Sequence, residues 1–171
     1  HEILKSGPNL RFGSVHEELT NSQQIDSFPK KSILLPLSWS YDLAYELFVK
    51  VKEAVENNKE YKVYIRNHPL LSKKQLITFL KQIEWNDYEF ADDESIQEWL
   101  PKTHAMILTG GSITVLEAVA MGTPVIRVIP DNDFSYDTFA GADYPLDPVN
   151  TVVEIKKQLQ IIEHLLDKDR D

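Results

Sequence analysis

Apolar positions follow two alternating patterns along the chain from residue 32 onward. Short apolar runs predict strands at 33–39, 61–67, 88–92, 105–109 and 124–129. Between these runs, apolar residues recur at helical spacing, which predicts helices at 43–55, 76–83, 95–100, 112–121 and 152–166. Ser95 and Glu98 have the spacing of a capping box at the start of the third helix, and Pro101 is expected to end it.

This alternation predicts an α/β fold, a doubly wound Rossmann-like parallel sheet with helices on both faces. Each right-handed crossover through a helix returns the chain to the same direction, so the strands run parallel. Residues 31–171 are expected to form this domain, and the less regular residues 1–30 to be an incoming linker or partial first element. Because the chain starts at His1 and not at a methionine, we expect a fragment cut from a longer protein.

Composition excludes several classes of function. The formal net charge is −9, which makes nucleic acid a poor partner because polyanions are bound through clustered lysines and arginines. With no cysteine, the chain has neither a disulfide nor a thiolate site. No apolar run approaches the roughly 20 residues that span a bilayer. The lack of cysteine is compatible with a reducing cytoplasm, which is the expected location.

Ligands of an open parallel sheet bind outside the carboxyl ends of its strands. In this sequence, that rule selects the loops at 38–42, 66–71, 91–95, 109–114 and 130–136. Candidate ligand-binding residues are therefore sought in these five loops and in the helix turns that follow them.

The loop at 109–114 contains Gly110, Gly111 and Ser112 directly before a predicted helix. Glycines let the backbone approach a ligand closely, and the helix start offers unpaired N–H groups that suit a phosphate. The same letters also describe a bare strand-to-helix turn in which the serine caps the helix. No Walker loop or dinucleotide fingerprint is present.

Thr114 and Glu117 follow in the same predicted helix. Glu117 lies among small apolar residues, as in a helix that is packed on several sides, so its carboxylate is a candidate to bind a sugar hydroxyl beside the phosphate. The alternative is an ordinary solvated helix position.

The stretch "TGGSITVLEAVAMGTPVI" resembles the donor-binding segment of GT-B glycosyltransferases, in particular those that transfer N-acetylglucosamine to lipid-linked peptidoglycan precursors. The resemblance implies that Gly111, Ser112 and Thr114 hold the donor phosphates and that Glu117 binds the ribose. Retaining GT-B enzymes often carry an earlier second glutamate. Thr109 stands at that position here, which favours the inverting type.

The stretch "RNHP" is similar to a motif of bacterial sialyltransferases, Kdo transferases and glycerophosphate transferases, which use CMP- or CDP-activated donors. The resemblance implies that His68 contacts the donor phosphate. The alternative is a histidine that only ends a strand before a proline turn. Arg66 is a candidate for a bidentate phosphate contact, or else a solvated residue. Ser38 follows the first predicted strand, where GT-B enzymes approach the donor phosphate or the acceptor.

The segment after the last predicted strand contacts the donor sugar in the same family, which makes Ser135 and Tyr136 candidates. Asp131, Asp133 and Asp137 have oxygen spacing like that of a calcium loop but lack its glycine and glutamate. GT-B transferases generally hold the diphosphate without a metal, so neither a metal nor a cofactor is expected.

The resemblance therefore implies the nucleotide-sugar-binding domain of an inverting glycosyltransferase for cell-envelope or surface polysaccharides. A missing N-terminal domain would supply the general base and bind the acceptor. If that acceptor lies in the membrane, the full-length protein is expected at the inner face of the membrane. The isolated chain is then expected to be inactive. One half of a UDP-sugar 2-epimerase and a non-catalytic protein-interaction domain remain as alternatives. UDP-linked and CMP- or CDP-linked donors both remain open, as do the sugar and the acceptor.

Overall fold

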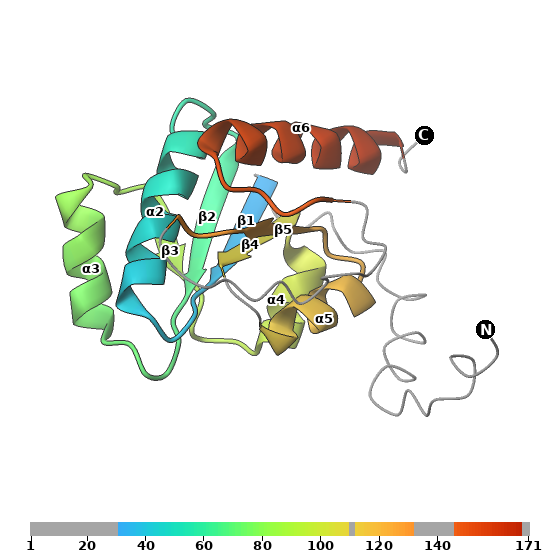
Figure 1. Cartoon of the computed structure of the whole chain (residues 1–171). Coiled ribbons are helices and arrows are strands. Elements are labelled where there is room, and N and C mark those ends of the chain that lie inside the picture. Colours follow the sequence, from blue (N-terminus) through green and yellow to red (C-terminus); the bar gives the residue numbers. More distant parts are fainter. Residues whose placement is uncertain (1–30, 110–111, 132–145, 169–171) are drawn as a thin grey trace.

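The computed structural model describes residues 31–109, 112–131 and 146–168, and within these residues a parallel sheet forms the centre of the domain (Figure 1). Its five strands are β1 (Lys31–Pro36), β2 (Tyr61–Arg66), β3 (Tyr88–Phe90), β4 (Ala105–Thr109) and β5 (Val125–Val128). Their order in the sheet is β3-β2-β1-β4-β5, and each neighbouring pair is parallel. The predicted α/β fold class is confirmed.

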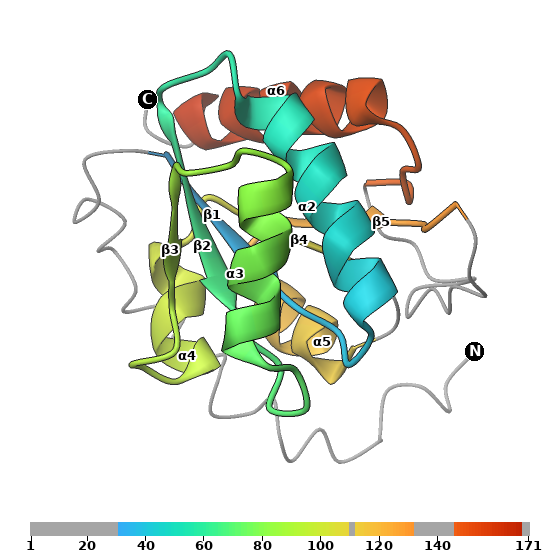
Figure 2. The same ribbon diagram turned by 90° about the vertical axis from the view of Figure 1, so that its left-hand side faces the viewer.

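Helices cover both faces of this sheet, as Figures 1 and 2 show. The helices are α2 (Tyr41–Val55), α3 (Lys73–Gln82), α4 (Ile96–Trp99), α5 (Ile113–Ala120) and α6 (Val152–Lys168), with the 3-10 helix η3 (Leu100–Lys102). One face carries α2, α3 and α6, and the opposite face carries the shorter α4 and α5.

The central strand β1 is buried on both sides, which explains its continuous apolar run. Ile33 and Leu35 belong to the core under α2, α3 and α6, whereas Leu34 belongs to the core under α4 and α5. All three side chains are fully buried. A strand that is covered on both faces is apolar at successive positions, whereas a strand with one solvent-exposed face alternates apolar and polar residues.

Several predicted boundaries differ from the structure by one to three residues, and the largest change in a strand is at the end of β1. β1 ends at Pro36 and not at residue 39, because Ser40 caps α2 with a side-chain hydrogen bond from the Leu43 N–H at 3.4 Å. α4 ends at Trp99 with Leu100 as its C-cap, so the α-helix stops before Pro101 as predicted, but Pro101 does not end all helical structure. It stands in the first turn of η3, where the missing N–H of a proline has no intrahelical partner to lose.

The outer edge of β5 is partly covered by the segment that precedes α6. Val128 forms a parallel bridge with Val149, and the Ile129 N–H donates to the Val149 carbonyl at 2.7 Å. The Val149 N–H in turn donates to the Arg127 carbonyl at 2.8 Å. These bonds satisfy backbone groups that an open sheet edge would expose.

Candidate functional site

The carboxyl ends of all five described strands lie along one edge of the sheet, and the chain leaves this edge in two directions. After β1 it enters α2 on one face, and after the neighbouring β4 it enters α5 on the other face. This divergence of adjacent strands is the switch point at which open α/β sheets bind ligands. The candidate site is therefore placed between the ends of β1 and β4.

The N-terminus of α5 is capped by Ser112. Its side-chain oxygen accepts from the Thr114 N–H at 3.2 Å, and its carbonyl accepts from the Val115 N–H at 3.1 Å. The cap predicted as one alternative is thus present, and Ser112 and Thr114 are both half-buried. A hydroxyl that accepts a cap bond still has its own proton to donate, so the cap leaves phosphate binding open. Gly110 and Gly111 lie outside the described residues.

Glu117 is half-buried on α5 and faces α4. Its Oε1 atom accepts from the Gln97 Nε2 at 3.4 Å, while its neighbours Val115 and Ala118 pack into the core. The residue is therefore not on a plainly solvated face. Glu117 lies within two helical turns of the Ser112 cap. Both residues belong to α5, the helix that follows β4.

His68 lies in the connection between β2 and α3. Its Nδ1 atom accepts from the Leu70 N–H at 3.2 Å, and its carbonyl accepts from the Leu71 N–H at 2.9 Å. An acceptor at Nδ1 assigns the ring proton to Nε2 in the neutral imidazole. The half-buried ring therefore has an Nε2–H donor at the carboxyl edge of the sheet.

Arg66 has a structural role that the sequence did not predict. Its Nη1 atom donates to the carbonyls of Ala91 at 2.9 Å and Glu94 at 2.5 Å, so one end of the guanidinium fixes the loop after β3. A bidentate phosphate contact would have to use the remaining nitrogens of the group.

Ser38 follows β1 at the switch point. Its hydroxyl oxygen is buried and has no hydrogen-bond partner among the residues that the structure describes. The next residue, Trp39, is 69% exposed beside it. Ser135 and Tyr136, the remaining candidates, lie outside the described residues.

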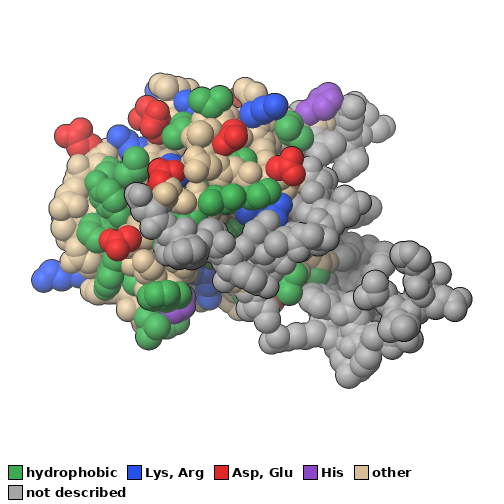
Figure 3. Space-filling model, viewed as in Figure 1, with side chains coloured by type: hydrophobic (Ala, Val, Ile, Leu, Met, Phe, Trp, Pro, Cys, Tyr) green, Lys and Arg blue, Asp and Glu red, His purple; other side chains and the backbone are tan. Residues whose placement is uncertain are grey.

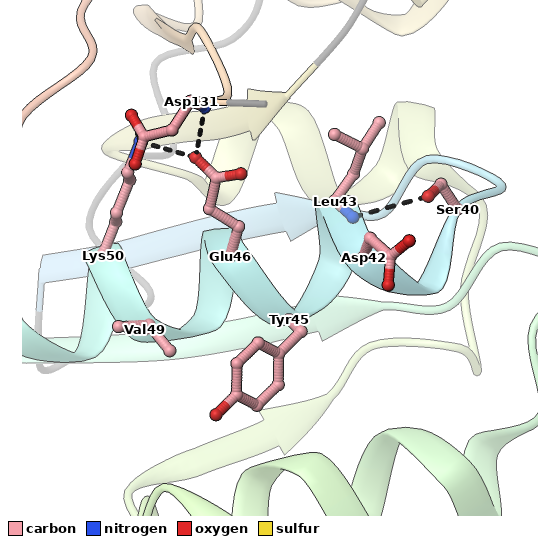
Figure 4. A pocket seen from close by; sticks show the side chains of 8 residues that line it. All are labelled: Ser40, Asp42, Leu43, Tyr45, Glu46, Val49, Lys50 and Asp131. Carbon is pink, nitrogen blue, oxygen red and sulfur yellow. Dashed lines mark hydrogen bonds and ion pairs between the residues drawn. The ribbon is translucent and has the colours of Figure 1, made fainter. Parts of the chain in front are cut away.

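A hollow apart from this candidate site lies along α2, beside Asp131 after the end of β5 (Figure 4). Its volume is about 650 Å³, and its lining residues are Ser40, Asp42, Leu43, Tyr45, Glu46, Val49, Lys50 and Asp131. Figure 4 shows Glu46, Lys50 and Asp131 converging on one side, with the Tyr45 and Val49 side chains pointing away from them. Three carboxylates and one ammonium line this hollow.

Lys50 and Glu46 were not predicted from the sequence, and Lys50 is the cation of this group. Its Nζ atom lies 2.6 Å from Glu46 Oε1 and 3.0 Å from Asp131 Oδ1, and the residue is only 8% exposed. Burial acts to lower the pKa of the Lys50 ammonium, but the hydrogen bonds to the two carboxylates outweigh it and raise that pKa above its ordinary value. A signal was present, since Lys50 shares the helical spacing of the apolar face, with Glu46 one turn before it.

Other site types find no support within the described part of the chain. There, no group of three or more histidine or acidic residues is arranged to hold a metal. None of the helices at 41–55, 73–82, 96–99, 113–120 and 152–168 is long and apolar enough to cross a membrane. Figure 3 shows acidic and basic side chains interspersed over the face in view.

Comparisons with solved structures find partial matches of fold. The yeast NADH kinase complexed with NADH matches with a TM-score of 0.45 and 15% identity, over 80% of this chain and 36% of the kinase. The UDP-GlcNAc 2-epimerase from Neisseria meningitidis bound to UDP-GlcNAc matches with a TM-score of 0.37 and 18% identity, over 57% of this chain and 31% of the epimerase. The chain thus spans about a third of each enzyme. No protein-family model and no curated protein matches the chain.

Proposed function

We propose that the chain is the nucleotide-sugar-binding domain of an inverting glycosyltransferase of the GT-B type, acting in cell-envelope or surface polysaccharide synthesis. The supporting observation is the placement of Glu117 and the capped N-terminus of α5 beside the switch point, with the His68 Nε2–H on the same sheet edge. The sheet order supports a ligand at this edge, and the nature of the donor rests on the sequence resemblance.

The spacing of the strands sets the size of the ligand. β2 and β4 are separated by β1 alone, so their carboxyl ends lie about 10 Å apart at roughly 4.8 Å per strand. A ligand that touches both His68 and the start of α5 must therefore extend across the end of β1, past Ser38. A nucleoside phosphate linked to a sugar is long enough to do so and carries its negative charge near the middle.

In the proposed reaction, an acceptor hydroxyl attacks the anomeric carbon of the sugar, and the bond from that carbon to the phosphate oxygen breaks. The negative charge that develops on the departing phosphate is stabilised by the N–H groups at the start of α5, by Ser112 and Thr114, and by His68. Glu117 binds the ribose hydroxyls. The general base and the acceptor site belong to an N-terminal domain that this chain does not contain, and no metal is needed.

Titration of the isotopically labelled chain with CMP, CDP, UDP and GDP, followed by amide NMR, tests this proposal. We expect saturable shifts at 112–117 and 66–68, and no comparable shifts at the opposite edge around Lys31 and Tyr61. The absence of any response at millimolar nucleotide would overturn the proposal in favour of a non-catalytic interaction domain. Incubation of the full-length protein with the responsive nucleotide sugar then separates transfer from 2-epimerisation, because only transfer requires an acceptor.

A further inference from the structure

The connection at 67–72, which carries His68, is short and largely exposed. Pro69 is exposed and Leu70 is 76% exposed, and Leu71 is the residue of this connection that is buried in the core. A loop with one apolar anchor does not by itself hold an imidazole in a fixed orientation. The Leu70 N–H orients the His68 ring only as far as the backbone of this connection is itself held in place, and polar contacts from elsewhere in the fold can hold it.

Asp92, from the loop after β3, spans both ends of this connection with one carboxylate. Its Oδ1 atom accepts from the Asn67 N–H at 2.9 Å, immediately before His68. Its Oδ2 atom pairs with the Lys73 Nζ at 3.0 Å, at the start of α3. Lys73 in turn lies over the Phe90 ring at 4.2 Å from its centroid, which keeps the ammonium close to β3.

Two further bonds complete the frame around His68. The Asn67 Nδ2 donates to the Leu71 carbonyl at 3.1 Å, and the Ser72 N–H donates to the Tyr41 hydroxyl at 2.8 Å. Among these contacts, the one to Asp92 is made by a charged acceptor, and it reaches the residue directly before His68 from the loop after β3. Charge-assisted hydrogen bonds are roughly twice as strong as neutral ones.

We propose that Asp92 is a positioning residue for His68. It fixes the Asn67 backbone, so that the Leu70 N–H meets the His68 Nδ1 and the Nε2–H is held toward the ligand. This inference rests on the proposed function for the role of His68, but the orientation itself is a property of the free chain. Asp92 acts through the backbone and does not touch the substrate.

Two variants of the full chain separate positioning from charge. Asp92→Ala removes both contacts, whereas Asp92→Asn keeps an oxygen for the Asn67 N–H and loses the charge that pairs with Lys73. The matched control is Asp87→Ala, which removes an exposed carboxylate 3.6 Å from Lys62 at the other end of β3. The probes are CMP and UDP, and the spectroscopic readout is the pair of ¹⁵N shifts of the His68 ring nitrogens.

We expect Asp92→Ala to weaken nucleotide binding about tenfold and to move the two ¹⁵N shifts toward those of a free, mixed-tautomer imidazole. Asp92→Asn should stay within about threefold of the unmodified chain, and Asp87→Ala should match it. If Asp92→Ala leaves both affinity and ring shifts unchanged, the inference is overturned. If Asp92→Ala does not fold, Asp92→Ser replaces it and is held to the same expectations. The serine hydroxyl is too short to bridge Asn67 and Lys73.

The ring shifts also separate this inference from the proposed function. If the unmodified chain binds neither CMP nor UDP, the function fails, and the ¹⁵N shifts in the free chain still decide whether Asp92 orients His68. If the chain binds nucleotide and the shifts of Asp92→Ala do not move, the function stands and the positioning role is wrong.

Discussion

The Lys50 Nζ lies 3.0 Å from the Asp131 Oδ1, although 81 positions separate the two residues in the chain. Glu46 completes the group, because its Oε1 atom contacts the Lys50 Nζ at 2.6 Å and accepts from the Asp131 N–H at 2.9 Å. Helix α2 thereby holds the backbone at the point where the chain leaves β5.

Replacement of Lys50 by methionine tests the energetic weight of this group. Lys50→Met leaves Glu46 and Asp131 close together without their cation, so we expect the free energy of unfolding to fall by about 2 kcal/mol. The expected loss is smaller than for a fully buried pair, because the Asp131 side chain is 54% exposed and water takes over part of its solvation. Urea denaturation followed by circular dichroism gives the value.

Lys52→Met is the matched control on the same helix. Lys52 lies 3.8 Å from Glu56, and its side chain is 29% exposed, so its loss should cost at most about 0.5 kcal/mol. Equal losses for the two variants would show that the group around Lys50 has no special weight.

Glu117→Ala tests the proposed ribose contact. Because the Glu117 carboxylate would accept two hydroxyl hydrogen bonds, its loss should raise the Kd for a nucleotide about tenfold, or roughly 1.4 kcal/mol. The free energy of unfolding should change little, since the residue is half-buried and the Gln97 Nε2 donates to its carboxylate at a long 3.4 Å. Calorimetric titration measures the affinity, and Glu53→Ala on the exposed side of α2 is the control. An unchanged Kd would remove Glu117 from the site.

The start of α6 should weaken in acid. Hydrogen bonds from the Asn150 and Thr151 N–H groups and from the Thr151 hydroxyl lower the pKa of Glu154 below its ordinary value of 4.5. A lowered pKa in the folded state means that the carboxylate stabilises the fold above about pH 4.5, and that this contribution is lost as the pH falls through the lowered pKa.

Glu154→Gln measures this contribution. The difference in unfolding free energy between the unmodified chain and the variant should be largest near neutral pH and should shrink steadily below pH 4.5. Urea denaturation at a series of pH values gives the curve, and Glu53→Gln corrects for the loss of a surface charge. A difference that does not change with pH would contradict the assignment.

The core beneath α2 should respond to truncation far more than the surface of α6 does. Leu47 is fully buried and Val153 is 74% exposed. Leu47→Ala should lower the free energy of unfolding by about 2–5 kcal/mol, because it leaves a cavity in the larger of the two cores. Val153→Ala should stay within about 0.5 kcal/mol. Similar values for both would mean that the helices do not pack as described.

Much of the fold could be predicted because its pattern is local. The apolar residues that recur at helical spacing in 43–55 are buried in α2, namely Leu43, Ala44, Leu47, Phe48, Val51, Ala54 and Val55. The capping box of Ser95 and Glu98 is present with both of its bonds. The order of the strands was not predicted, because the periodicity within β1 or β4 states that a strand is buried and not which strand lies beside it.

For the site, the sequence predicted the edge of the sheet at which the candidate residues lie. It did not predict the hydrogen-bond partner of each side chain. Arg66 donates to the Ala91 carbonyl, which is more than 20 positions away, and Lys50 pairs with Asp131 across 81 positions. Neither partner can be predicted from the residues that neighbour Arg66 or Lys50 in the sequence. Ser112 shows the opposite case. Its cap bond to Thr114 is local and was foreseen as one of two alternatives, while its contact with a phosphate stays a prediction.

The position of β1 has a consequence for how this chain is made. β1 is the earliest of the described strands, yet it lies in the middle of the sheet, and its second neighbour begins only at Ala105. During synthesis β1 can pair with β2 once Arg66 has emerged, but its other side stays an open, apolar template until β4 follows. The interval between these two events is the period in which a nascent chain is most exposed to pairing with another copy of itself.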